Sequence, residues 1–138
     1  MTGKYAALTL PGVPGTEIVE ANGINNEGDV VGLAGNQGFI RLAGGAVHRI
    51  AVPGASETIP LGVNDNDTVV GAYIDGTGST TMIHGFIWRI GGSLIKGVND
   101  PVADSQSYLI GINNEGDVVG SYVDSKGNTD GFLAYPAF

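Results

Sequence analysis

A ten-residue word occurs three times in this chain and constrains its fold more than any other feature. Residues 23–32 read GINNEGDVVG, residues 111–120 repeat the same ten letters, and residues 62–71 read GVNDNDTVVG. A word that returns three times in 138 residues indicates a chain built from copies of one structural unit. We align three units, residues 4–46, 47–93 and 94–138, and expect them to form a single domain.

Each unit reads as four short strands. They are an apolar strand, the strand that opens the word, the Val-Val-Gly strand that closes it, and a strand that begins with Gly-Phe, as in GFIRLA, GFIWRI and GFLAYPAF. Val, Ile, Tyr, Phe and Trp dominate these segments, and Gly, Pro, Asn and Asp separate them. No window shows sustained helical periodicity with caps, so we expect an all-β fold.

The word itself is predicted to be a β-hairpin. Its turn places Gly28 and Gly116 where a positive φ is often needed, and the second copy has Asp67 there. An aspartate reaches that conformation at some cost. The asparagine before each turn is expected to bond to nearby backbone N–H groups, which explains the Asn-rich turns without any ligand.

The order of the strands predicts how the sheets close. The first unit starts with an apolar strand at residues 5–10, and the third ends with the Gly-Phe strand at residues 131–138. Pairing these two strands would remove two exposed sheet edges. Three units fall short of the four to eight blades of ordinary propellers. We therefore expect propeller-like blades, three per chain, that reach a six-bladed ring in a homodimer. A β-prism closed within one chain is the alternative.

Composition narrows the class of partner. Six Lys and Arg residues stand against 14 Asp and Glu, a formal net charge of -8, which disfavours nucleic acid and anionic membranes. The absence of cysteine excludes disulfides and thiolate metal sites. No apolar stretch approaches the roughly 20 residues of a membrane helix, and the first ten residues do not resemble a signal peptide.

The units resemble the HAF repeats of predicted extracellular bacterial proteins. The matching stretches are GVNDNDTVVGAYIDG followed by HGF, IAVPGASET, and GINNEGDVVGSYVDSKG. This resemblance covers nearly the whole chain and implies a tandem β-repeat protein, secreted, with no established chemistry to carry over. The HGF triplet occurs only in the second unit, and the other units have QGF and DGF.

Hairpin alternation divides the loops of a unit between its two ends. One end carries short, uniform turns. At the other end the segment between Val-Val-Gly and Gly-Phe has 5, 13 and 10 residues in the three units. Variable loops on a fixed scaffold commonly bind ligands, and aromatic rings beside carboxylates and amides suit a sugar. The candidate ligand-binding residues are Tyr73, Asp75, His84, Trp88, Tyr122, Asp124, Asn128 and Asp130.

Each candidate also has a purely structural interpretation. Tyr73, Tyr122 and Trp88 can pack in the core, and the polar residues can be solvated loop. Asp65, Asp67, Asp124 and Asp130 are weak calcium candidates because several oxygen ligands lie close together, although no complete EF-hand loop is present. No cofactor is otherwise indicated.

Neither a G-x-S-x-G, an H-E-x-x-H nor a P-loop motif occurs in the chain. We therefore expect a non-enzymatic binding module that recognises a glycan or another polar ligand. The alternatives are a small enzyme with a pocket at the ring centre or between subunits, and a purely structural or adhesive repeat.

Overall fold

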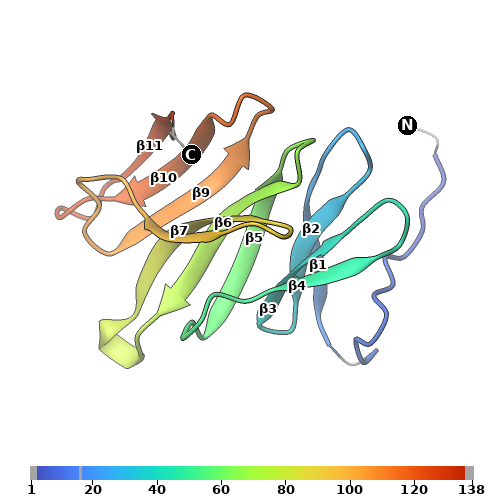
Figure 1. Ribbon diagram of the computed structural model, residues 1–138. Helices are drawn as coiled ribbons and strands as arrows, with labels where there is room; N and C mark the ends of the chain where they lie inside the picture. Colours follow the sequence, from blue (N-terminus) through green and yellow to red (C-terminus); the bar gives the residue numbers. More distant parts are fainter. Residues whose placement is uncertain (1–2, 16, 136–138) are drawn as a thin grey trace.

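The computed structural model describes residues 3–15 and 17–135 and confirms the all-β class (Figure 1). The only helical element among these residues is one 3-10 turn, η1 (Gly78–Thr80). The strands are β1 (Val19–Ile24), β2 (Val30–Ala34), β3 (Gln37–Arg41), β4 (Val47–Ile50), β5 (Glu57–Val63), β6 (Thr68–Asp75), β7 (Met82–Arg89), β8 (Leu94–Val98), β9 (Gln106–Ile112), β10 (Val118–Val123) and β11 (Thr129–Ala134).

The strands form a four-stranded sheet and a curled seven-stranded sheet. The first has the order β1-β2-β3-β4, and the second has the order β11-β10-β9-β7-β6-β5, with β8 paired to β7. All pairings are antiparallel except one parallel bridge between Ile83 and Gln106, which joins β7 to β9. The larger sheet therefore consists of two antiparallel meanders, β5 to β8 and β9 to β11, whose strands pair with each other only at this bridge.

The three copies of the word form three hairpins with matching hydrogen bonds, as predicted. In each hairpin the backbone N–H of the leading asparagine donates to the carbonyl four residues on, at 3.2, 3.1 and 3.0 Å for Asn25, Asn64 and Asn113. Gly28, Asp67 and Gly116 have φ of 89°, 56° and 92°. Positive φ is thus confirmed at all three turns, including the one that holds an aspartate.

The glycine that closes the word is required by a close backbone approach. Opposite it, β1, β5 and β9 each contain a register shift that leaves one residue bulged. A Cβ placed on Gly71 would overlap the carbonyl of Ile59 and lie 2.8 Å from the Phe86 ring. Only glycine fits between a bulged strand and a packed aromatic ring.

The core lies between successive meanders. One cluster joins Val31 and Ile40 of the first sheet to Val63 and Phe86 of the next meander. A second cluster joins Val70 and Ile87 to Leu109 and Val118 in the third. Burial of these side chains, worth about 1.5–3 kcal/mol each, makes the meanders stack face to face.

The expected closure of the sheet by the two ends of the chain is wrong for this structure. Residues 5–10 form no strand, and β11 pairs only with β10 in the part of the chain that is described. Leu8 and Leu10 instead pack on the first sheet. Three stacked meanders do not turn far enough to bring the last one back to the first, and Figure 1 shows the two ends on opposite sides. Neither a closed propeller nor a prism forms within one chain, and residues 136–138 of the expected last strand lie outside the described residues.

The expectation of four strands in every unit is confirmed for the second unit (β4 to β7) and the third (β8 to β11), whereas the described residues of the first unit contain only β1, β2 and β3. The sheets are offset by one strand from the unit boundaries at residues 46 and 93, because β4 pairs with β3 and β8 pairs with β7. The first and second meanders therefore take their fourth strand from the start of the following unit, and the third meander, β9 to β11, has three strands among the described residues.

Candidate functional site

The three word turns lie side by side and are joined by a ladder of amide hydrogen bonds. The Asn25 side chain donates to the carbonyl of Asn64 at 3.0 Å, and the Asn64 side chain donates to the carbonyl of Asn113 at 3.0 Å. Asn64 is buried, and its Oδ1 also accepts the N–H groups of Asn66 and Thr68 at 3.0 Å. The predicted asparagine-to-backbone bonds are confirmed, and the same side chains also tie one unit to the next.

Asp65 forms a second connection between the turns. The backbone N–H and the amide of Asn26 donate to its carboxylate at 2.8 Å, and the amide of Asn114 donates to it at 2.9 Å. These hydrogen bonds lower the pKa of Asp65, and those from Asn26 contribute most. The Asp65 N–H donates in turn to the side-chain oxygen of Asn114 at 2.8 Å. Asp65 of the second unit thus links the word turns of the first and third units by hydrogen bonds.

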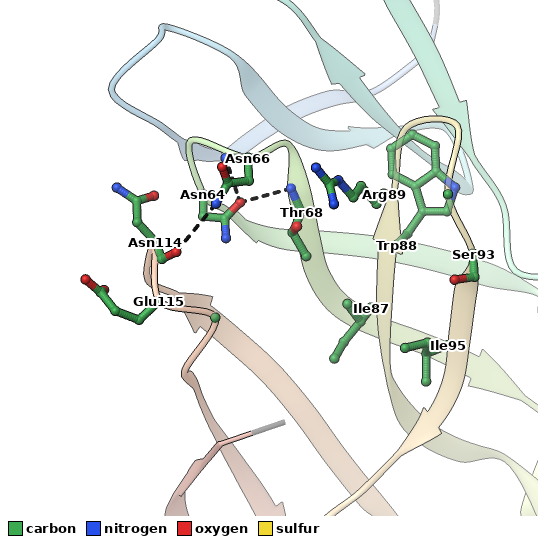
Figure 2. Close-up of a pocket in the computed structure, with 12 residues that line it drawn as sticks. Asn64, Asn66, Thr68, Ile87, Trp88, Arg89, Ser93, Ile95, Asn114 and Glu115 are labelled. Atoms are coloured by element: carbon green, nitrogen blue, oxygen red, sulfur yellow. Dashed lines mark hydrogen bonds between the residues drawn. The ribbon is translucent and has the colours of Figure 1, made fainter. Parts of the chain in front are cut away.

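A groove opens beside the ladder, between the β9–β10 turn and the β7–β8 hairpin (Figure 2). Its volume is about 370 Å³, within the range of small-molecule sites. Its polar lining is contributed by Asn64, Asn66, Thr68, Arg89, Ser93, Asn114 and Glu115. Ile87 and Ile95 supply apolar surface. We call this cavity the turn groove.

The side chains of β7 alternate between the turn groove and the opposite core. Ile87 belongs to the cluster shared with the third meander, whereas Trp88 packs against the cluster shared with the first sheet. Figure 2 shows Arg89 extending toward Thr68, while the Trp88 indole points away from Asn114. The groove therefore offers a guanidinium, amides, hydroxyls and a carboxylate above an aliphatic floor. Trp88, one of the predicted ligand-binding residues, also belongs to the lining, although its indole points away from Asn114.

The equivalent position between the first and second units is occupied by two carboxyl groups. Asp29 and Asp67 stand where the turn groove has Thr68 and Gly116. Burial and a hydrogen bond to Asp29 raise the pKa of Asp67. Burial acts against ionisation of Asp29 too, but bonds from Asn25 and the Ala43 N–H outweigh it and lower the pKa of Asp29. Of the two carboxyl groups, Asp67 is therefore the one that protonates first as pH falls. The smaller Thr68 and Gly116 leave the corresponding space open.

The predicted variable-loop residues of the second unit are only partly brought together. Tyr73 and His84 face each other on β6 and β7 with ring centroids 5.3 Å apart. Tyr73 is buried, and this burial raises the pKa of its hydroxyl. The amide of Asn99 lies 3.0 Å from Nδ1 of His84 beside a hollow of about 150 Å³. Asp75 is exposed and accepts the N–H of Gly76.

The predicted residues of the third unit are engaged mainly with each other. Asp124 accepts the N–H groups of Lys126 and Asn128 at 2.9 Å, and the bond from Asn128 is the largest cause that lowers its pKa. The ring of Tyr122 lies 6.3 Å from that of Phe132. Asp130 is exposed. Trp88 lies near the opposite end of β7 from His84, so the structure does not unite the eight candidates in one site.

The calcium candidates are also separated. Among the described residues no three His, Cys, Asp or Glu side chains gather closely enough to hold a metal ion. Asp65 and Asp67 lie in the word turns, whereas Asp124 lies in the β10–β11 loop and Asp130 on β11. Calcium binding stays an untested prediction.

No protein-family model, curated protein or solved structure matches this chain. The resemblance to HAF repeats and the extracellular location that it implies remain predictions. Within residues 3–15 and 17–135 the structure contains no helix of the length and apolar character that crosses a bilayer.

Sequence reasoning missed Arg89, Ser93 and Glu115 as candidate site residues. It placed the uniform turns at one end of the units, considered them only for calcium at Asp65 and Asp67, and assigned the polar ligand to the variable loops. The available signal was the exchange of Asp29 for Thr68 between two copies of an otherwise regular word, because a smaller residue at a repeated contact leaves space.

Proposed function

We propose that this protein is a non-enzymatic binding module that recognises a glycan, or another ligand rich in hydroxyl groups, in the turn groove. The observation that supports this most directly is the groove itself. It has about 370 Å³ of space with converging donors and acceptors. The hollow at the variable-loop end has about 150 Å³, below the usual size of ligand sites.

The chemistry of the lining supports a hydroxylated ligand. Amides, hydroxyls and a carboxylate can donate to and accept from sugar hydroxyls, and Ile87 and Ile95 can cover the C–H face of a ring. Glu115 and a net charge of -8 oppose a strongly anionic ligand. Arg89 offers a planar fork of donors for a pair of neighbouring hydroxyls.

Rigidity also supports binding at this end. The ladder fixes the backbone of Asn64 and Asn114 on both sides of the groove. A preformed site loses little conformational entropy when a ligand enters. In the variable loop between β10 and β11, by contrast, the hydrogen bonds between Asp124 and Asn128 stay within that loop and do not tie it to another unit.

A glycan array followed by titration calorimetry tests the proposal. For a glycan that binds, Arg89→Gln and Glu115→Gln should each weaken affinity about tenfold, the usual effect of losing a hydrogen bond to a charged group. Arg41→Gln is the matched control, since Arg41 ends the corresponding strand β3 outside the groove. Its affinity should be unchanged.

Two results would contradict the proposal. A folded protein that binds no glycan would favour the structural or adhesive alternative. Binding that Asp75→Asn and Asn128→Ala abolish, while Arg89→Gln leaves it intact, would place the ligand at the variable loops.

A further inference from the structure

We infer that the exposed face of the third meander is a docking surface for a second copy of this chain, bound head to tail. The equivalent faces of the three meanders differ in how far their apolar side chains are exposed. Val31 and Ile40 of the first sheet are both 0% exposed, and Val70 and Ile87 are 0% and 4% exposed, because the next unit covers them. The corresponding Val119 and Leu133 are 48% and 53% exposed. Together with Ile110, Asn113 and the free side of β11, we call them the tail surface.

The other end of the molecule carries the complementary side chain. Val63 fills the space against Val31 and Ile40 and is 7% exposed. Its counterpart in the first unit, Ile24, is 68% exposed. We call Ile24, Asn25, Asn26 and residues 5–10 the head surface. Ile24 of one copy would fill the hollow of about 430 Å³ that Val119, Leu133 and Tyr135 line on another.

The hydrogen-bond ladder has matching ends. In both internal junctions an asparagine amide of one unit donates to an asparagine carbonyl of the next. The amide of Asn113 instead donates to Asp117 of its own turn at 3.1 Å. Continuing the ladder would direct the Asn113 amide to the carbonyl of Asn25 in a second copy. The N–H of Asn114 would then meet the side-chain oxygen of Asn26, as the N–H of Asp65 meets Asn114 within the chain.

The N-terminal segment already lies where a preceding meander would hold its fourth strand. Leu10 and Val13 pack on Phe39 and Ala34 in the first sheet, as Val52 and Ala55 pack on Phe86 and Tyr73 in the second unit. The turn that follows is the same, with Val13 N–H donating to Leu10 at 3.2 Å and Ala55 N–H to Val52 at 3.1 Å.

What residues 5–10 lack, within the described chain, is a strand beside them. Among the described residues, β3 and β7 pair on both sides, whereas β11 pairs only with β10. The free edge of β11 in one copy is therefore suited to pair with residues 5–10 of the other copy. The pairing of Ile40 with His48 in the first sheet sets the register and places Leu133 opposite Ala6 of the partner copy.

Two copies joined in this way at both ends would close a ring of six units, within the range of known propellers. The contact is heterologous, since head meets tail, and such contacts form rings only where the rotation closes. The turn groove lies inside one chain, so this inference and the proposed ligand can fail independently.

Light scattering and sedimentation over a dilution series test the assembly. The wild-type chain should be a dimer, and Leu133→Asp or Ile24→Lys should each raise the dissociation constant at least about tenfold, as for a core residue of an interface. Val102→Asp is the control, since Val102 is 62% exposed in a different loop. Combining Ile24→Lys with Leu133→Asp should restore the dimer, because head-to-tail contact places lysine against aspartate.

A second measurement fixes the register. The chain has no cysteine, so Ala6→Cys with Leu133→Cys should yield a covalent dimer on oxidation, since directly opposed Cβ atoms lie about 4.5–5.5 Å apart. Ala6→Cys with Val102→Cys should not. A wild-type chain that is monomeric at every concentration, or a dimer that Leu133→Asp leaves unchanged, would overturn the inference. Open-ended filaments would overturn closure by two copies.

Discussion

Replacing Asn64 and Asn113 separately by alanine measures how much the ladder between units stabilises the fold. The two residues occupy the same place in two copies of the word, but their surroundings differ. The side chain of Asn64 is buried and makes three hydrogen bonds, one of them to the next unit. The side chain of Asn113 is exposed and makes hydrogen bonds only within its own turn, to the backbone N–H and the carboxylate of Asp117.

The expected magnitudes follow from these bonds. Three hydrogen bonds at a net value of about 1 kcal/mol each give a loss of about 3 kcal/mol for Asn64→Ala. The Thr68 N–H would also lose the Asn64 acceptor, which adds to the cost, whereas the Asn113 carbonyl would keep the N–H of Gly116. For Asn113→Ala, water replaces both lost bonds at an exposed position, so the loss should be about 1 kcal/mol.

Urea and thermal denaturation followed by circular dichroism provide the assay, at a protein concentration low enough to keep the chain monomeric. In a chain of this size a loss of 1 kcal/mol lowers Tm by about 3–4 °C, so the two variants should differ by about 7 °C. Asn64→Asp isolates the bond between units. It keeps both acceptor bonds but turns an oxygen toward the Asn113 carbonyl, and it should lose stability as well.

Equal losses for Asn64→Ala and Asn113→Ala in the monomer would refute this reasoning. They would mean that each turn is stabilised only by its own bonds and that the junction between units depends on apolar packing alone. Convergence of the two losses at high protein concentration would instead agree with a second copy that buries Asn113.

Three further predictions follow from single positions. Gly71→Ala should destabilise the fold by at least about 2 kcal/mol because its Cβ would overlap the backbone of Ile59, whereas Gly44→Ala, with open space around it, should be nearly neutral in the same denaturation assay. Asp67→Asn should stabilise the protein at pH 7 and lose this advantage near pH 3: the raised pKa of Asp67 means that the wild type is most favoured while Asp67 is protonated and loses stability as pH rises through its folded pKa. Stability measured against pH that shows a constant gain would disprove this. The buried Tyr73 should ionise above pH 10 in an ultraviolet titration, because burial raises its pKa; Tyr73→Phe should reduce the amplitude of this late phase and leave the contribution of Tyr122, whose pKa is raised by desolvation as well, and a titration unchanged by the substitution would contradict the assignment.

The local structure could be predicted from the sequence because its determinants are local. A repeated word with glycine after an Asn-rich turn specifies a hairpin, since φ preferences and short-range hydrogen bonds act within a few residues. This explains why the three hairpins, the positive φ at Asp67 and the backbone bonds of Asn25, Asn64 and Asn113 agree with expectation. The all-β class follows from the same short-range preferences.

The candidate site was less predictable because it arises where two units meet. Trp88 and His84 lie on the same face of β7, but four residues apart, so they stand near opposite ends of the strand and do not share one site. Asp124 looked available in the sequence, but its oxygens are taken by the N–H groups of its own loop. Arg89 and Glu115 lie far apart in the sequence and line one groove only because the third meander stacks on the second.

The sequence by itself determined the repeated hairpin, the strand-rich class and the glycines that those turns and bulges require. Only the tertiary structure decided which equivalent positions differ: Val70 is buried and Val119 exposed although both stand in the same Val-Val-Gly word. The physical reason is that identical units acquire different surroundings by their place in the stack, and burial depends on the neighbour that covers a side chain as well as on the side chain itself.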